Sequence, residues 1–223
     1  MALSKVGLVE PIDSMTVSGT TPTLTIGDAG AEDAKIVFDG NAQDYHIGLD
    51  DSADTLVIGK GSALGTTTAM SFDANGIITK PLQPAFHVVK NANQENLAND
   101  GEVTITFEVA VYDQNSDFDL TNNRFVAPVT GKYFLTARVR LDALDTAPDY
   151  YVTKIVTSNR SYINIMNPDF TGDGSFHSQE ITVLADMDAS DTAILQVQQS
   201  GGTAQTDVPT STSYTYFTGF LAC

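Results

Sequence analysis

The stretch RFVAPVTGKYFLTARVRL, residues 124–141, contains the clearest strand pattern in this sequence. It begins with a short apolar run that ends at Pro128, and it turns at Thr130-Gly131-Lys132. Beyond the turn, apolar and polar residues alternate, as they do in a β-strand with one buried and one solvent-exposed face. The predicted buried face carries Tyr133, Leu135, Ala137, Val139 and Leu141, and the opposite face carries Thr136, Arg138 and Arg140.

Similar patterns fill the chain from residue 82 to its end. Segment 103–111 alternates in the same way, which predicts one half-buried strand with Val103, Ile105, Phe107, Val109 and Val111 on its inner face. We expect further strands in PAFHVVK, DYYVTKIVTSN, RSYINIM, FHSQEITVL, AILQVQQ and TSYTYFTGFL, whereas helical periodicity is almost absent. About eight strands at this spacing predict a jelly-roll β-sandwich over residues 82–223, and an all-β fold class.

Residues 21–81 have a different composition, rich in Gly, Asp, Ala and Thr and poor in aromatics. Three related units follow one another: LTIGDAGAEDAKIVFDGN, YHIGLDDSADTLVIGKG and AMSFDANGIITK. Each is predicted to hold a short strand, an acidic turn and a second short strand. Such a unit cannot bury a core alone and needs a neighbour, either the next repeat or the same repeat on another chain. We therefore expect a β-repeat stem, as a shaft of three chains, with a small β-meander inside one larger domain as the alternative.

The overall composition excludes several classes of protein. The chain has 223 residues, with 11 Lys and Arg against 28 Asp and Glu, a formal net charge of −17 at pH 7. This charge repels nucleic acid, and no basic stripe with aromatics is present. No apolar run approaches the roughly 18 residues of a membrane helix, and MALSKVGLVEP lacks the apolar region of a signal peptide, so we expect neither membrane insertion nor secretion by this route. Cys223 is the single cysteine, so no intrachain disulfide forms.

Three motifs in order give the second part of the chain a family resemblance. FVAP at 125–128 followed by TGKYF at 130–134 resembles the F-x-A-P-x-x-G-x-Y-x-F core of the complement first-component q (C1q) globular head. PAF at 84–86 resembles the start of that domain, and TYFTGFL at 215–221 resembles its closing strand, S-x-F-x-G-x-L. The resemblance covers residues 84–223. Two departures are the aromatic directly after Tyr133, and Ser190-Asp191 where the family usually has Gly-Asp.

The resemblance implies a homotrimeric head, because this family shares a trimeric jelly roll with tumour necrosis factor. The closing strand would lie in the sheet that faces the trimer axis. Aromatic side chains buried between subunits contribute strongly to association. The implied trimer interface is Tyr214, Tyr216, Phe220 and Leu221; the alternative is that these residues fill the core of one subunit.

The first part of the chain resembles the repetitive stem segments of bacteriophage tail fibres, through IGLDDSADTLVIG and FDANGIITKPLQPAF. This resemblance implies a non-enzymatic virion structural protein, made in the bacterial cytoplasm, with residues 1–20 as the segment attached to other virion proteins. The head would bind a host surface glycan or protein through loops at its distal end, with residues 114–121, 145–149 and 169–174 as candidates. A capsid decoration protein and a small glycan-acting enzyme are the alternatives.

Residue types that carry chemistry are dispersed in this sequence. His46, His87 and His177 lie in different segments, and no G-x-S-x-G motif or phosphate-binding Gly-rich loop is present, so we predict no catalytic residues. Two acidic clusters offer hard oxygen ligands of the kind that calcium prefers. They are Asp50, Asp51 and Asp54 in the stem, and Asp186, Asp188 and Asp191 in the head. Calcium is the one cofactor considered, and solvated turns are the alternative reading of both clusters.

Overall fold

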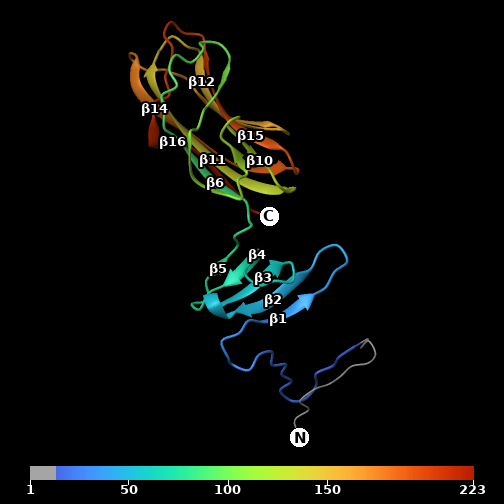
Figure 1. Ribbon diagram of the computed structural model, residues 1–223. Helices are drawn as coiled ribbons and strands as arrows, with labels where there is room; N and C mark the ends of the chain where they lie inside the picture. The colour runs from blue at the N-terminus through green and yellow to red at the C-terminus, as the bar shows by residue number, and fades with distance from the viewer. Residues whose placement is uncertain (1–13) are drawn as a thin grey trace. The chain divides into compact units, whose positions relative to one another are not determined.

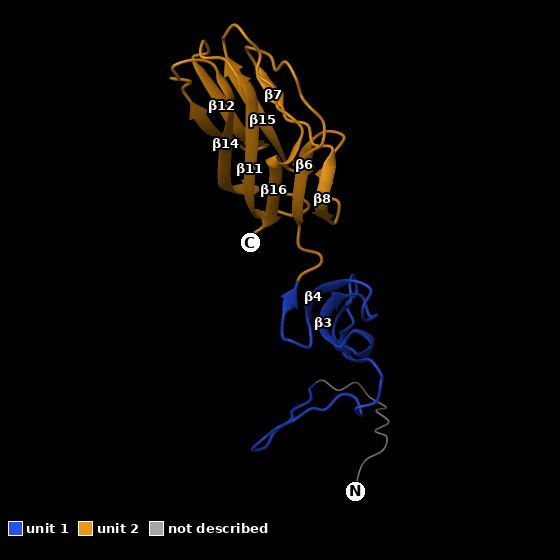
Figure 2. Cartoon of the chain, turned by 90° about the vertical axis from the view of Figure 1, so that its left-hand side faces the viewer, with its two compact units in different colours: residues 1–79 blue, residues 80–223 orange. Residues whose placement is uncertain are grey.

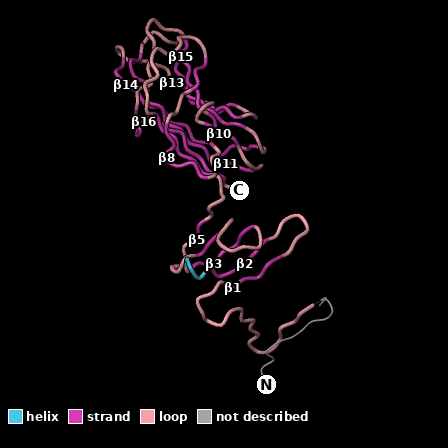
Figure 3. Tube along the Cα trace, viewed as in Figure 1, coloured by secondary structure: helices cyan, strands magenta, loops and turns pink. Residues whose placement is uncertain are grey.

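Regular structure is almost entirely β, which confirms the all-β fold class (Figures 1 and 3). The computed structural model describes residues 14–223. It divides them into two compact units at Thr79 and Lys80, two residues before the boundary predicted between 81 and 82 (Figure 2). Most of the predicted attachment segment, residues 1–13, lies outside the described residues. In the part of the chain that is described, the one helical segment is the 3-10 turn η1 (Asp51–Ala53), and no helix is long and apolar enough to cross a membrane.

Unit 1 is a five-stranded antiparallel sheet in which each strand pairs with its neighbours in sequence. The strands are β1 (Ala34–Phe38), β2 (Tyr45–Asp50), β3 (Thr55–Lys60), β4 (Thr68–Phe72) and β5 (Ile78–Thr79). The second and third predicted units form the hairpins β2–β3 and β4–β5. The first strand of the first unit was predicted wrongly, because residues 24–26 are exposed and outside any strand. The five strands form a β-meander. The sequence analysis gave a meander inside one larger domain as the alternative to a stem, whereas this meander is a separate unit.

Unit 2 is a sandwich of two sheets, the jelly roll predicted for residues 82–223. One sheet has the order β14-β11-β16-β6-β8, and the other has the order β13-β12-β15-β10-β9, with β7 also paired to β15 (Figures 1 and 2). The strands are β6 (Ala85–Lys90), β7 (Glu102–Thr104), β8 (Val109–Gln114), β9 (Phe118–Asp119), β10 (Arg124–Val126), β11 (Gly131–Leu144), β12 (Tyr150–Thr157), β13 (Ser161–Met166), β14 (Gly174–Met187), β15 (Thr192–Ser200) and β16 (Ser211–Leu221).

The stretch at residues 124–141 forms β10 and most of β11, one strand in each sheet. The alternation in β11 is confirmed, since its five predicted inner residues are buried at 0–1% exposure. Aromatic rings fill the space between the sheets. Phe86 of β6 lies 4.7 Å from the ring of Phe125, 5.2 Å from Phe118 and 5.1 Å from Phe217. Each of the three motifs therefore supplies aromatic side chains to the core: Phe86, Phe125 with Tyr133, and Phe217.

Segment 103–111 is not the single strand that its alternation predicted. β7 pairs with β15 in one sheet, and β8 pairs with β6 in the other, so the chain crosses between the sheets at residues 105–108. Ile105 and Phe107 are buried as predicted, but Val111 is 60% exposed. Side chains replace the missing ladder bonds: Gln94 accepts from the Thr106 N–H at 3.1 Å, and Asn123 accepts from the Phe107 N–H at 2.7 Å. The alternation of apolar and polar residues does not show which strand each half of the segment pairs with.

Candidate subunit interface

The outer face of the β14-β11-β16-β6-β8 sheet carries many large apolar side chains that nothing else in unit 2 covers. Phe176 is 66% exposed, Leu184 57%, Tyr112 51%, Tyr214 49% and Phe220 47%. Phe134 and Tyr216 are half-buried on the same face. We call these seven residues the aromatic face. Its members come from β8, β11, β14 and β16, so the face extends across the sheet.

Strand register places the members of the aromatic face in rows. Leu184, Phe134 and Phe220 are directly opposite one another on β14, β11 and β16, and the rings of Phe134 and Phe220 lie 5.3 Å apart. The adjacent row is polar: Thr182, Thr136 and Thr218, with 2.7 Å between the Thr136 and Thr182 hydroxyl oxygens. Cross-strand pairs of this kind stabilise a sheet and fix the positions of its outward side chains. The face is thus a preformed surface.

The structure brings together three of the four predicted interface residues. Tyr214, Tyr216 and Phe220 point outward from β16 and belong to the aromatic face. Leu221 lies on the opposite side of the strand and packs against the hydrophobic core. Because side chains alternate along a strand, Phe220 and Leu221 cannot both point outward. The sequence analysis missed Tyr112, Phe134, Phe176 and Leu184, whose strands give no local signal of their order in the sheet.

A histidine lies within this surface. The ring of His87 on β6 is stacked between Tyr112 at 5.8 Å and Tyr216 at 5.5 Å. Burial by these rings lowers the pKa of His87 below its usual value of 6.5, because the charged form loses hydration. Neutral imidazole is therefore the form that this stack favours.

Arginine supplies the polar part of the same surface. Arg140 binds Asp142 with two bonds, of 2.7 and 2.9 Å. Its guanidinium also lies 4.9 Å from the centre of the Phe176 ring and 5.5 Å from that of Tyr214. Arginine stacked on aromatic rings is enriched in the energetically important parts of protein interfaces. The composition of the aromatic face is that of a protein-binding surface.

The three loops predicted to bind a receptor divide between the two ends of the head. Thr146 donates from its N–H and its hydroxyl to Asp173, at 3.0 and 2.8 Å, so residues 145–149 and 169–174 lie together at what we call the loop end. Residues 114–121 lie at the opposite end, because Gln114 pairs with Ala85 and donates to the carbonyl of Gln83 at 2.6 Å. Grouping all three loops at one end was wrong. The antiparallel pairing of β8 with β6 returns the chain to the end where it enters the head.

Asp145 holds the loop end together. Its buried carboxylate accepts hydrogen bonds from the backbone N–H groups of Ala147, Ala204 and Thr203. These donors lower the pKa of Asp145 to about 2, because they stabilise the charged form. The loops at 145–149 and 201–206 are therefore fixed to each other at neutral pH, and they present a shaped polar surface.

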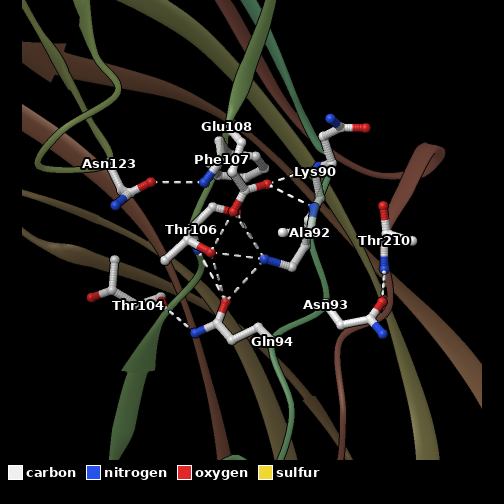
Figure 4. A network of polar contacts seen from close by, with 11 residues as sticks. Lys90, Ala92, Asn93, Gln94, Thr104, Thr106, Phe107, Glu108, Asn123 and Thr210 are labelled. Carbon is white, nitrogen blue, oxygen red and sulfur yellow. Dashed lines mark hydrogen bonds and ion pairs between the residues drawn. The ribbon is translucent and has the colours of Figure 1, made fainter.

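A second polar network holds the crossover between the sheets (Figure 4). Lys90 is buried, and its ammonium donates to the Thr106 hydroxyl at 2.8 Å and lies 3.6 Å from Glu108. Burial lowers the pKa of Lys90, and the attraction of Glu108 opposes that effect. Glu108 also accepts from the N–H groups of Asn91 and Ala92, at 2.8 and 3.2 Å. All donors and acceptors in this network serve the fold.

The acidic turns do not form the metal sites considered from the sequence. Asp186 pairs with Arg160 at 3.4 Å, Asp188 accepts from Thr130 at 3.4 Å, and Asp191 accepts from the Asp188 N–H at 2.9 Å. In the stem, the Asp50 carboxylate accepts from Ser52 and from the Ala53 N–H, while Asp51 and Asp54 lie in the turn that it caps. Within residues 14–223, no three His, Cys, Asp or Glu side chains lie close enough to hold an ion. The carboxylates stabilise turns and are not directed at a common point.

The three histidines lie in separate surroundings. His46 is buried in unit 1 and its Nδ1 lies 2.8 Å from the Gly61 carbonyl oxygen. His87 is in the tyrosine stack, and His177 lies beside Phe170, with 6.4 Å between ring centres. Each therefore has a packing environment of its own.

The fold is a jelly-roll head of two sheets, one of which exposes the aromatic face. The sequence model of the C1q domain family matches residues 85–222, and the chain belongs to that family. The globular domain of a zebrafish complement 1qA protein is 18% identical, with 63% of this chain and 98% of that one covered and a TM-score of 0.47. Murine APRIL is 10% identical, and the match spans 62% of this chain and 98% of the APRIL chain, with a TM-score of 0.46. The search of curated proteins finds no match to this chain.

Proposed function

We propose that this chain is a homotrimeric structural protein of a bacteriophage virion, a fibre without enzymatic activity whose C1q-type head attaches to the host surface. The observation that carries the trimer is the aromatic face, with Phe176, Leu184, Tyr112, Tyr214 and Phe220 at 47–66% exposure on one sheet. Contiguous apolar patches of this kind mark interaction sites on soluble proteins. The chain carries a net charge of −17, yet the seven side chains of the aromatic face are uncharged, which suits contact with identical copies.

Attachment is assigned to the loop end of the head. There the loops at 145–149, 169–174 and 201–206 are held by hydrogen bonds of Asp145 and Asp173. The exposed polar side chains include Asp149, Asp169, Thr171 and Gln205. Three copies on one axis present three such surfaces, so weak binding at each adds to useful avidity. A host surface glycan or protein is the proposed partner.

Placement in a virion rests on the resemblance of residues 47–59 and 72–86 to phage fibre stems. The same trimer on the capsid would be a decoration protein. Labelling virions with an antibody to the head tests both: a few copies at the tail support the proposal, many copies over the shell support decoration, and absence from the virion contradicts both.

The trimer is tested by mass photometry of the full chain. We expect a particle of three times 23.8 kDa at nanomolar concentration. Phe220→Asp places a charge in the aromatic face and is expected to shift the population to monomer by at least tenfold, because a buried unpaired carboxylate opposes association. Ile163→Asp is the matched control, since Ile163 is 61% exposed on the edge strand β13 of the other sheet. A monomeric wild-type chain would overturn the proposal.

A further inference from the structure

One face of the unit 1 sheet is apolar from edge to edge. Register places side chains from all five strands on this face in three cross-strand rows. They are Phe38, Tyr45 and Lys60; Ile36, Ile47, Ile58 and Met70; and Ala34, Leu49, Leu56, Phe72 and Ile78. We call this set the stem face. Lys60, at the end of one row, is the single charged residue in it.

Nothing in the described part of unit 1 covers the stem face. Seven of its members are 38–55% exposed: Ile36, Phe38, Tyr45, Ile47, Leu49, Leu56 and Ile78. A large apolar side chain has a surface of roughly 150–250 Å². At their exposed fractions, the seven side chains together therefore expose roughly 600 Å² per chain. That area reaches the upper end of the roughly 300–600 Å² of the largest patch on a typical monomer, and it approaches the roughly 800 Å² that each partner buries in a stable interface.

The opposite face of the same sheet is covered by residues of unit 1 itself. The segment after β3 returns over it: the Lys60 N–H donates to the Thr67 carbonyl at 3.0 Å, and His46 contacts the Gly61 carbonyl at 2.8 Å. Val57 and His46 are buried there at 2% and 0% exposure. The close packing on this face requires glycine at positions 48 and 59, because a Cβ at Gly59 would lie 2.6 Å from the His46 ring. One side of the sheet is thus closed by its own chain, and the other is left open.

We propose that the stem face packs against the stem faces of two other copies of this chain, around the axis of the trimer. This inference rests on the proposed trimer and adds a second, separate interface to it. β1 to β5 pair with one another within one chain, and only the outer edges of β1 and β5 are left without a partner strand. The proposed contact is made by the side chains of the stem face. On this proposal the copies exchange no strands, and the stem is three packed meanders; the sequence left open whether the three chains intertwine.

Charge and tethering both favour identical copies as the occupant. In a chain of net charge −17, a face without a carboxylate can meet itself without repulsion. Residues 80–84 separate β5 from β6, and five residues span at most about 17 Å. Trimerisation of the heads would therefore hold three stem faces at an effective concentration in the millimolar range.

The decisive test compares neighbouring residues on the edge strand β1. Ile36 lies on the stem face and is 42% exposed, whereas Val37 points to the other face and is 37% exposed. Each is replaced by Cys in a Cys223→Ser background of the full chain, and a short bismaleimide is added. We expect inter-chain cross-links for Ile36→Cys at least fivefold above those for Val37→Cys.

Ile36→Asp and Val37→Asp give an independent readout by amide hydrogen exchange over residues 45–58. We expect Ile36→Asp to accelerate exchange at least tenfold relative to Val37→Asp, while mass photometry still shows a trimer held by the heads. A trimer with equal cross-linking at both positions overturns this inference and leaves the proposed function intact. Protection of residues 45–58 without cross-links assigns the stem face to a segment of the same chain and also overturns it. A monomeric wild-type chain overturns the proposed function itself.

Discussion

The two units of this chain differ in how much apolar surface each can bury alone. Unit 2 places two sheets face to face, and residues such as Phe86, Phe125, Tyr133, Leu135 and Phe217 reach 0% exposure between them. Unit 1 has one sheet, and within residues 14–79 Val57 is the single fully buried apolar side chain. A second layer is what converts an amphipathic sheet into a stable domain. Unit 2 contains its second layer, whereas residues 14–79 contain only the one sheet.

The largest expected effect comes from separating the units. Residues 80–223 alone should retain a cooperative thermal transition, because their core is complete within one chain. Residues 14–79 alone should show none at micromolar concentration, since a single sheet with an open apolar face lacks sufficient burial. Circular dichroism melts of the two fragments measure this. A sharp, concentration-independent transition in residues 14–79 would contradict the comparison.

A smaller effect is expected from one ring inside the head. Phe86→Ala removes a side chain that contacts three other aromatic rings, and should lower the free energy of unfolding by about 3–5 kcal/mol. Ile163→Ala is the control, because Ile163 is 61% exposed on the edge strand β13, outside the aromatic face. Its cost in the unfolding of the isolated head should stay below about 1 kcal/mol. Guanidinium titration of residues 80–223 distinguishes the two, and equal costs would show that Phe86 is not a core anchor.

The smallest effect is a pH dependence at His87. Its pKa in the folded head is lowered by burial, so the unfolded state binds a proton more readily than the folded one. The contribution of neutral His87 is complete above pH 6.5 and is lost as the pH falls below that value toward the folded pKa. The thermal midpoint of the head should therefore fall between pH 7 and pH 5.

His87→Gln should reduce this slope, because glutamine keeps a polar side chain that does not titrate. The slope of the thermal midpoint against pH that remains in His87→Gln measures the contribution of the carboxylates, which also take up protons at acidic pH. If wild type and variant have identical slopes, His87 does not contribute.

Much of the head could be predicted from sequence because its signals are local. Alternation in residues 131–141 fixes which side chains of β11 point inward, and the motifs at 84–86 and 215–221 mark the first and last strands of the domain. Tyr214, Tyr216 and Phe220 were assigned to one surface by resemblance, and the alternation of β16 supports their common direction. The same alternation excludes Leu221 from that surface, because adjacent residues of a strand point to opposite faces.

Other features depended on which strands become neighbours. Segment 103–111 alternates perfectly, yet it crosses between the sheets at residues 105–108, because the partner of each half lies far away in the chain. Asp186, Asp188 and Asp191 are close in sequence, but their carboxylates bind Arg160, Thr130 and backbone. Spacing gives the residue types in a turn and does not give the direction of each side chain.

Local sequence patterns were enough to predict the all-β class, the division near residue 80 and the family of the second part, and they contain no evident catalytic motif. Period-two alternation and motif order suffice for these, since both are properties of neighbouring residues. The tertiary structure alone decided the aromatic face, the loop end and the stem face. Each of these is assembled from strands whose order in the sheet is set by long-range pairing, and no local pattern encodes that order.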